Sequence, residues 1–204
     1  LFTDVYYPFI SGVVVAVDTL RKALEEQGHK VYIISINNDL KNNKYIKKGN
    51  CIKIPGTPIG VMDFSFRFTY PYKSIKYIKD LKLDLIHSHT EFSMGMFAKS
   101  IAKKLNIPMV QTFHTLYEDG INYITKGYFP KTSKGILKMY MKTFFNNTIK
   151  EVIVPTDKTK DFLKQRYHLK QNINIIPNGI DTKKFDYKKI SKKDILKLKK
   201  LYNN

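Results

Sequence analysis

Residues 84–105 read DLIHSHTEFSMGMFAKSIAKKL and contain one complete strand and helix unit. Residues 84–87 fit a short strand and residues 94–105 fit an amphipathic helix. The same alternation of aliphatic run and amphipathic stretch recurs along the chain, which predicts repeated strand and helix units around a parallel sheet. Ligands of such open sheets bind at the carboxyl ends of the strands. The loops that follow the strands are therefore where functional residues are expected.

Short aliphatic runs predict strands at residues 1–3, 31–36, 51–54, 84–87, 108–113, 151–154 and 173–176. Helices are expected at residues 12–27, 72–83, 94–105, 134–148 and 157–167, and again after Ser191, which opens a capping pattern. The connections should be right-handed crossovers. The chain is thus predicted to be an α/β, three-layer Rossmann-like domain with an open, mainly parallel sheet of about seven strands.

The end of the chain does not follow this alternation of strands and helices. A turn signal at Pro177-Asn178-Gly179 is followed by a very basic run and a helical pattern with no strand after it. We interpret residues 1–177 as one domain and residues 178–204 as a hinge and the start of a second domain. The alternative is a C-terminal helix that packs back on the same domain.

The chain is strongly basic, with 36 lysines and arginines against 17 aspartates and glutamates and a formal net charge of +19. Such a charge favours anionic partners, or reflects a lysine-rich composition that solvates the surface. Only three of the cations are arginines, the residue that reads guanine edges, so sequence-specific nucleic-acid binding is not expected. An anionic membrane surface is the better candidate.

Two further features indicate the compartment. Cys51 is the single cysteine, so an intramolecular disulfide is impossible, which fits a reducing cytoplasm. The longest aliphatic run, residues 13–17, is far shorter than the roughly 18 residues that cross a bilayer. A cytoplasmic protein, peripheral to a membrane at most, is therefore expected.

The first candidate loop follows the first strand, where Asp4 begins a stretch that delivers Gly12 to the start of a helix. Free N–H groups at a helix start favour an anion, although a glycine at such a turn also serves tight packing. The chain contains neither the glycine pattern of dinucleotide-binding proteins nor that of P-loop nucleotidases. Both of those classes are disfavoured.

Histidines dominate the next two loops. Strand alternation would place His87, His89 and Glu91 on one side, close to His114 at the end of the following strand. These residues fit either a metal site or a polar cluster. His114 fits a hydrogen-bond donor or a base near neutral pH, or a structural side chain that caps a loop.

A possible membrane contact lies between residues 64 and 83, where aromatic residues mix with lysines. On a helical wheel the apolar residues share one arc and the lysines spread over the other, as in a helix that lies on anionic lipid or in an ordinary surface helix. The four lysines are Lys73, Lys76, Lys79 and Lys82. Residues 136–145 are apolar almost all round, so they are either buried or expose an apolar patch.

Five stretches carry a family resemblance: FTDVYYPFISGV (2–13), DLIHSHTEFSMG (84–95), TFHTLYED (112–119), VIVPT (152–156) and IPNGID (176–181). Together they resemble the N-terminal half of a glycosyltransferase family 4 enzyme with the GT-B fold. Within the family the chain is most similar to bacterial diacylglycerol glucosyltransferases. The resemblance implies a retaining hexosyltransferase that uses a nucleotide sugar, UDP-glucose by this analogy, and a lipid acceptor such as diacylglycerol.

The resemblance also implies roles for particular residues. His114 would meet the transferred sugar as the catalytic residue, and no metal or cofactor would be needed. The acceptor or the donor phosphate would be bound by Asp4, Gly12, His89, Glu91, Tyr117, Glu118 and Asp119. The donor-binding domain of the family would follow residue 204, so this chain alone is expected to be inactive. The alternatives are a noncatalytic membrane or polyanion-binding module, or a family 4 transferase with a non-lipid acceptor.

Overall fold

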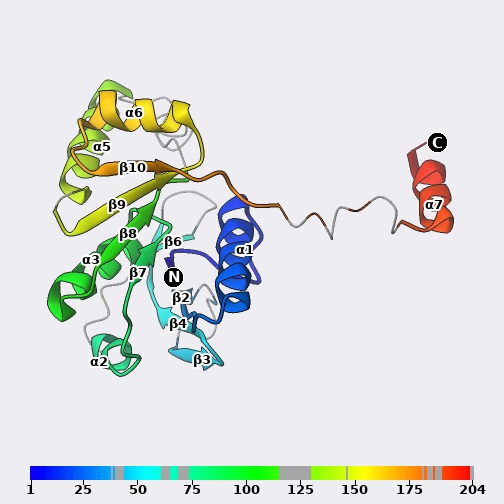
Figure 1. The fold of residues 1–204 in the computed structure, drawn as a ribbon, viewed down its shortest axis with the longest axis horizontal. Coiled ribbons are helices and arrows are strands. Elements are labelled where there is room, and N and C mark those ends of the chain that lie inside the picture. The colour runs from blue at the N-terminus through cyan, green and yellow to red at the C-terminus, as the bar shows by residue number, and fades with distance from the viewer. Residues whose placement is uncertain are drawn as a thin grey trace.

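An eight-stranded sheet forms the centre of the computed structural model, which describes residues 1–37, 39, 44–60, 65–68, 74–114, 130–145, 147–180, 182, 186 and 190–202. The strand order is β10-β9-β8-β7-β1-β2-β4-β3, and all neighbours are parallel except β3 and β4 (Figure 1). The strands are β1 (Phe2–Thr3), β2 (Ile33–Asn37), β3 (Ile46–Lys48), β4 (Cys51–Pro55), β7 (Ile86–Ser88), β8 (Met109–Thr112), β9 (Ile149–Val154) and β10 (Asn172–Ile175). The predicted open, mainly parallel α/β sheet is confirmed.

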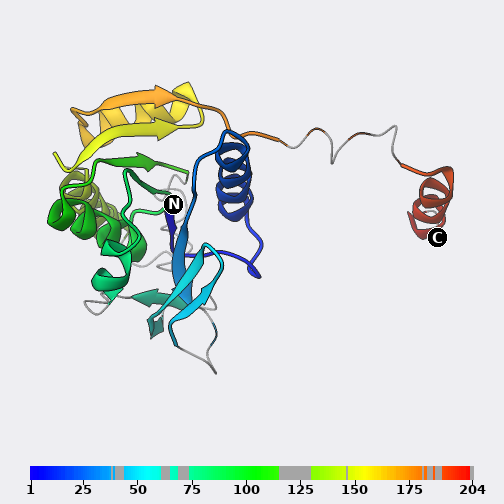
Figure 2. The same ribbon diagram turned by 60° about the horizontal axis from the view of Figure 1, so that its bottom comes forward.

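Helices cover both faces of this sheet. They are α1 (Gly12–Glu26), α2 (Ser74–Lys79), α3 (Ser93–Leu105), α5 (Pro130–Phe144) and α6 (Asp157–Tyr167). A further helix, α7 (Lys192–Tyr202), does not cover the sheet. Figures 1 and 2 place α1 on one side of the strands and α3 and α5 on the other. Two separate cores follow from this division: Val14 and Val17 of α1 pack with Ile33, whereas α2, α3, α5 and α6 contribute to one larger cluster.

Local signals explain where the helices begin and end. The Ser11 side chain caps α1 by accepting from the N–H of Val14 at 3.3 Å, and Thr156 caps α6 in the same way. Gly28, just beyond α1, has a φ of +87°, the left-handed conformation that commonly follows the end of a helix. The crossovers α1, α3 and α6 therefore start and stop within about two residues of their expected bounds.

Several elements differ from the prediction, among them α5, which begins at Pro130 and ends at Phe144 where residues 134–148 were expected. The helix expected at residues 72–83 is only Ser74–Lys79, and Lys82 lies beyond it with a left-handed φ of 50°. A two-stranded antiparallel pair, β5 (Thr57–Gly60) and β6 (Ser65–Phe68), occupies a region for which no strand was expected. Strand β3 was not expected and adds an antiparallel edge to the sheet. The predicted basic helix is therefore present but shorter than expected, since the chain turns after Lys79.

The chain after β10 leads away from the sheet in Figure 1, and α7 has no buried residue. The domain boundary at residues 177 and 178 stays a prediction. Within the described part of the chain, no helix is both long enough and apolar enough to cross a membrane.

Candidate functional site

Three central strands, β1, β7 and β8, end at the same edge of the sheet and bring the predicted site residues together. The N–H of His89 donates to the carbonyl of Phe2 at 2.9 Å, which continues the pairing of β7 with β1. The N–H of Asp4 donates to the hydroxyl of Thr90 at 3.1 Å. The loops after β1 and β7 are therefore joined to each other, and the end of β8 lies beside β7.

A stack of three histidines lies at this edge. The rings of His87 and His89 are 4.2 Å apart, and those of His89 and His114 are 5.3 Å apart, with interplanar angles of 26° and 23°. Nδ1 of His89 is 3.0 Å from Nε2 of His114, a hydrogen bond between the two rings. Nε2 of His87 is 2.6 Å from the hydroxyl of Thr112. The expected convergence of His87, His89 and His114 is thus what the structure shows.

These histidines are uncharged at neutral pH. Burial lowers the pKa of His87 to about 3 and that of His114 to about 4. Burial also holds the pKa of His89 well below its usual value, and the neighbouring rings add to the effect. Neutral imidazoles act as hydrogen-bond donors and acceptors, so this edge is suited to binding hydroxyl groups. The part of the chain that is described contains no group of three or more His, Cys, Asp or Glu placed to hold a metal ion.

Asp4 connects the end of β1 to the start of α3. Its Oδ1 accepts from the N–H of Met94 at 2.7 Å, in the first turn of α3, where Phe92 at the cap position supplies no side-chain bond. Burial raises the pKa of Asp4 to about 6, against the lowering effect of the bonds to Met94 and Thr90. Asp4 was expected to bind a ligand, and the structure gives it a capping role.

Glu91 is fully buried rather than presented to solvent. Its Oε1 accepts from the side-chain amide of Gln111 at 2.8 Å. Its backbone carbonyl accepts from the hydroxyl of Tyr140, on α5, at 2.6 Å. Burial raises the pKa of Tyr140, and the charges of Glu91 and Asp4 raise it further. The loop after β7 is therefore held from the sheet and from α5.

Gly95 makes the close approach of α3 to this loop possible. A Cβ at Gly95 would lie 2.1 Å from the carbonyl oxygen of Thr90 and 3.1 Å from Cε2 of Phe144. The same carbonyl accepts a hydrogen bond from the hydroxyl of Ser88 at 2.9 Å. Only a glycine fits here without a shift of the backbone that carries His89 and Thr90.

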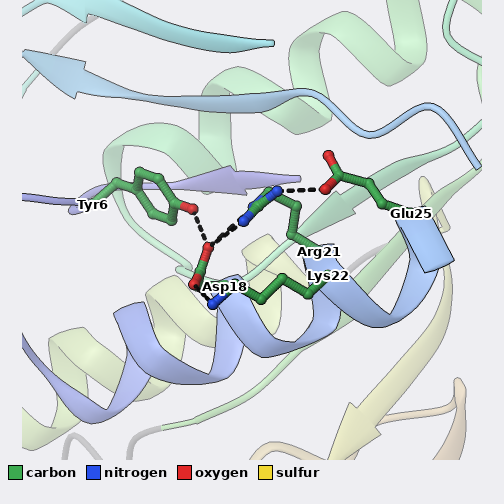
Figure 3. A network of polar contacts seen from close by, with 5 residues as sticks. All are labelled: Tyr6, Asp18, Arg21, Lys22 and Glu25. Atoms are coloured by element: carbon green, nitrogen blue, oxygen red, sulfur yellow. Dashed lines mark hydrogen bonds and ion pairs between the residues drawn. The ribbon is translucent and has the colours of Figure 1, made fainter. Parts of the chain in front are cut away.

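A second polar network fixes the loop between β1 and α1 (Figure 3). The hydroxyl of Tyr6 donates to Oδ1 of Asp18 at 2.7 Å, and Arg21 and Lys22 pair with the same carboxylate at 2.9 and 3.0 Å. Burial alone would raise the pKa of Asp18, but these partners hold it below its usual value. Arg21 also pairs with Glu25. At the end of this loop Gly12 is exposed, and no described atom lies within 4 Å of a Cβ built there.

The remaining predicted residues are placed as follows. Tyr117, Glu118, Asp119 and Lys73 lie outside the described residues. Lys76, Lys79 and Lys82 are exposed, but only the first two belong to α2. Gln111, Thr112 and Tyr140 also belong to the site, although none of the sequence patterns above predicted them. A glutamine within an apolar strand was the one available signal, because a buried polar side chain needs a partner.

The family follows from a comparison with known proteins. A model of glycosyltransferase family 4 matches residues 10–184. The chain belongs to glycosyltransferase family 4. In shape the domain is similar to a sucrose-phosphate synthase from Thermosynechococcus elongatus, with a TM-score of 0.51, 18% identity and coverage of 98% of this chain and 97% of that one. That likeness shows the fold, and the predicted family and GT-B architecture are confirmed.

Two family 4 relatives are named alpha-monoglucosyldiacylglycerol synthase. The protein from Streptococcus pneumoniae (strain ATCC BAA-255 / R6) is 36% identical over 200 residues, which cover 98% of this chain and 44% of that protein. The one from Acholeplasma laidlawii is 35% identical over 190 residues, covering 91% of this chain and 47% of that protein. The chain spans less than half the length of either relative.

Proposed function

We propose that residues 1–177 form the acceptor-binding domain of a retaining hexosyltransferase that moves glucose from UDP-glucose to diacylglycerol. The observation that carries the proposal is the match along 98% of this chain to a protein named alpha-monoglucosyldiacylglycerol synthase. That name specifies an α-linked product, and UDP-glucose carries its glucose in α linkage. Transfer between the two keeps the anomeric configuration, so a retaining reaction is the consistent choice.

The sheet edge is suited to this chemistry. The bond from the glucosyl C1 to the phosphate oxygen breaks, a bond from C1 to the acceptor hydroxyl oxygen forms, and UDP leaves as the acceptor hydroxyl gives up its proton. His114 is uncharged because burial lowers its pKa to about 4, and its ring nitrogen Nδ1, which bonds no described residue, would bond a sugar hydroxyl. The open N-terminus of α1 at Gly12 offers N–H groups to the donor phosphate.

The same proposal assigns the partners and the place of action. The donor would be held by a second domain, and no metal or cofactor would be required. Because the acceptor is a lipid and the chain carries a net charge of +19, the domain would work on an anionic membrane surface, at the cytoplasmic face. Tyr117, Glu118 and Asp119 would line the acceptor side.

The test is to incubate the complete protein that contains this chain with UDP-glucose and with vesicles that hold diacylglycerol and an anionic lipid. We expect an α-linked glucosyl diacylglycerol, identified by mass and by the anomeric proton signal. A β-linked product would refute retention, and transfer only to a soluble acceptor would refute the lipid acceptor. Residues 1–204 alone should give no glycolipid, because positioning of donor against acceptor supplies a large part of the rate. Robust synthesis by this piece would contradict a separate donor domain.

A further inference from the structure

His89 is the most deeply buried of the three histidines, and one of its two ring nitrogens is hydrogen-bonded to His114. Its side chain is only 2% exposed, and its Nδ1 lies 3.0 Å from Nε2 of His114. Its other ring nitrogen, Nε2, is buried and has no hydrogen-bond partner among the described residues. The unpartnered nitrogen helps to decide whether His89 or His114 carries the proton of the hydrogen bond between the two rings.

Two neutral arrangements are possible for this pair. In the first, Nδ1–H of His89 donates to Nε2 of His114, and the unpartnered nitrogen of His89 is a lone pair. In the second, Nε2–H of His114 donates to His89, whose own proton must then sit on the buried Nε2. Buried N–H groups without a partner are rarer in native proteins than buried acceptors without one. The first arrangement is therefore favoured.

We propose that His89 is a positioning residue, which donates from Nδ1 to Nε2 of His114 and so keeps the proton of His114 on Nδ1. That proton is then available for a hydrogen bond to an oxygen of the transferred sugar. This inference rests on the proposed function, in which His114 meets that sugar. In this role His89 acts through His114 and does not contact a ligand itself.

The surroundings of His89 suit this task. The ring of His87 stacks on it at 4.2 Å, and the ring of His114 lies edge to edge with it, with centroids 5.3 Å apart, so rotation of the imidazole is restricted. His87 is itself anchored through its Nε2, 2.6 Å from the hydroxyl of Thr112. The backbone N–H of His89 pairs with the carbonyl of Phe2 at 2.9 Å, which fixes the main chain at this position. The donor is thus held in place from the sheet and from both neighbouring rings.

Three substitutions separate the hydrogen bond from the packing. In His89→Asn, the side-chain amide can place an N–H close to the position of Nδ1 and retain the donor. In His89→Gln, the amide reaches the position of Nε2 instead, and in His89→Phe the ring shape remains without any donor. Leu163→Ala, at a fully buried position on α6, is a control that lowers stability away from the site.

The measurements use the complete protein that contains this chain, with histidines labelled with ¹⁵N. The ring nitrogen signals report which nitrogen of His114 carries the proton, and a His114→Gln variant assigns those signals. We expect Nδ1–H in the original protein and a shift toward Nε2–H in His89→Phe. The glucosyl transfer assay should show kcat reduced by roughly 10- to 100-fold in His89→Phe and His89→Gln, the range seen when the partner that orients a functional histidine is removed.

His89→Asn should keep most of the original kcat, and Leu163→Ala should lower the melting temperature without lowering kcat. An Nε2–H tautomer of His114 in the original protein would overturn the inference. So would equal losses of kcat in His89→Asn and His89→Phe, because they would show that the ring shape and not the donor matters. If the original protein transfers no glucose to diacylglycerol, the proposed function fails, and the tautomer of His114 still decides whether His89 positions it.

Discussion

Replacing Gly95 with alanine should destabilise the domain, whereas the same change at Gly135 should stabilise it. Both glycines lie inside helices, α3 and α5, where alanine is favoured by about 1 kcal/mol. At Gly135 no described atom lies within 4 Å of the new Cβ. At Gly95 the Cβ would lie 2.1 Å from the carbonyl oxygen of Thr90, so the contact must open by at least 0.9 Å to reach the 3.0 Å limit of real contacts.

The cost at Gly95 comes from backbone that cannot move freely. Thr90 is buried, its carbonyl accepts from Ser88, and its hydroxyl accepts from the N–H of Asp4. Overpacking costs about 1–3 kcal/mol and the upper end applies here, while a weakened hydrogen bond adds about 1 kcal/mol. After the gain in helix propensity, Gly95→Ala should lower the free energy of unfolding by about 3 kcal/mol. For a domain of this size that is a fall in melting temperature of roughly 6–12 °C.

Thermal unfolding followed by circular dichroism would measure both variants against the original chain. Gly135→Ala should melt about 2–4 °C higher, which shows that the assay resolves a change of about 1 kcal/mol. A melting temperature of Gly95→Ala within a degree of the original would refute the reasoning. It would mean that the loop after β7 yields easily, and that the close packing of α3 does not hold His89 and Thr90 in place.

Three other predictions concern the site and the surface. In the complete protein His114→Ala should reduce turnover by roughly 10²-fold or more, since a contact with the reacting sugar would be removed, and should affect turnover far more than stability; a fully active variant would contradict its role. Burial lowers the pKa of His87 to about 3 and that of His114 to about 4 from 6.5, so the unfolded chain binds more protons below pH 6.5. Urea titrations should therefore show the free energy of unfolding falling from pH 6.5 to 4, partly opposed by the raised pKa of Asp4, and the slope should shrink in a variant with both histidines changed to Phe. Each lysine near an anionic membrane surface contributes about 1 kcal/mol to the free energy of binding. Binding of the domain to anionic vesicles should therefore weaken in high salt. It should also weaken in a variant with glutamine at Lys73, Lys76, Lys79 and Lys82. The matched control has glutamine at Lys192, Lys193, Lys199 and Lys200, and equal weakening in both sets would show an effect of net charge alone.

The sheet could be predicted because buried parallel strands appear in the sequence as short aliphatic runs. Residues 33–36 and 151–154, for example, read IISI and EVIV, and capping residues mark the helices between such runs. The β5 and β6 pair was missed for a specific reason. Ser65-Phe66-Arg67-Phe68 alternates polar and aromatic residues with the period of a strand, but the aromatic residues and lysines of residues 64–83 were interpreted together as a possible membrane contact.

The site was predictable only in part. The rule that ligands bind where parallel strands end was enough to bring His89 and His114 to one edge, because their strands are neighbours. It could not reveal that Tyr140 bonds the carbonyl of Glu91, 49 positions away in sequence. Nor could it show that Gly95 is required by the carbonyl of Thr90. Contacts of this kind depend on how α3 and α5 pack against the loop, and no local pattern encodes that packing.

The residues that give this domain its positive charge are not the residues of its candidate site. The net charge of +19 counts every histidine as neutral, and the structure agrees with that count at the site, where burial keeps His87, His89 and His114 uncharged at pH 7. The positive charge therefore comes from lysines such as Lys76 and Lys79, which are exposed on α2. Attraction between exposed charges is screened within about 8 Å at physiological salt, whereas hydrogen bonds between buried neutral rings are not. Under the proposed function, the exposed lysines would therefore attract the domain to an anionic surface, and the buried histidines would bind the sugar through hydrogen bonds.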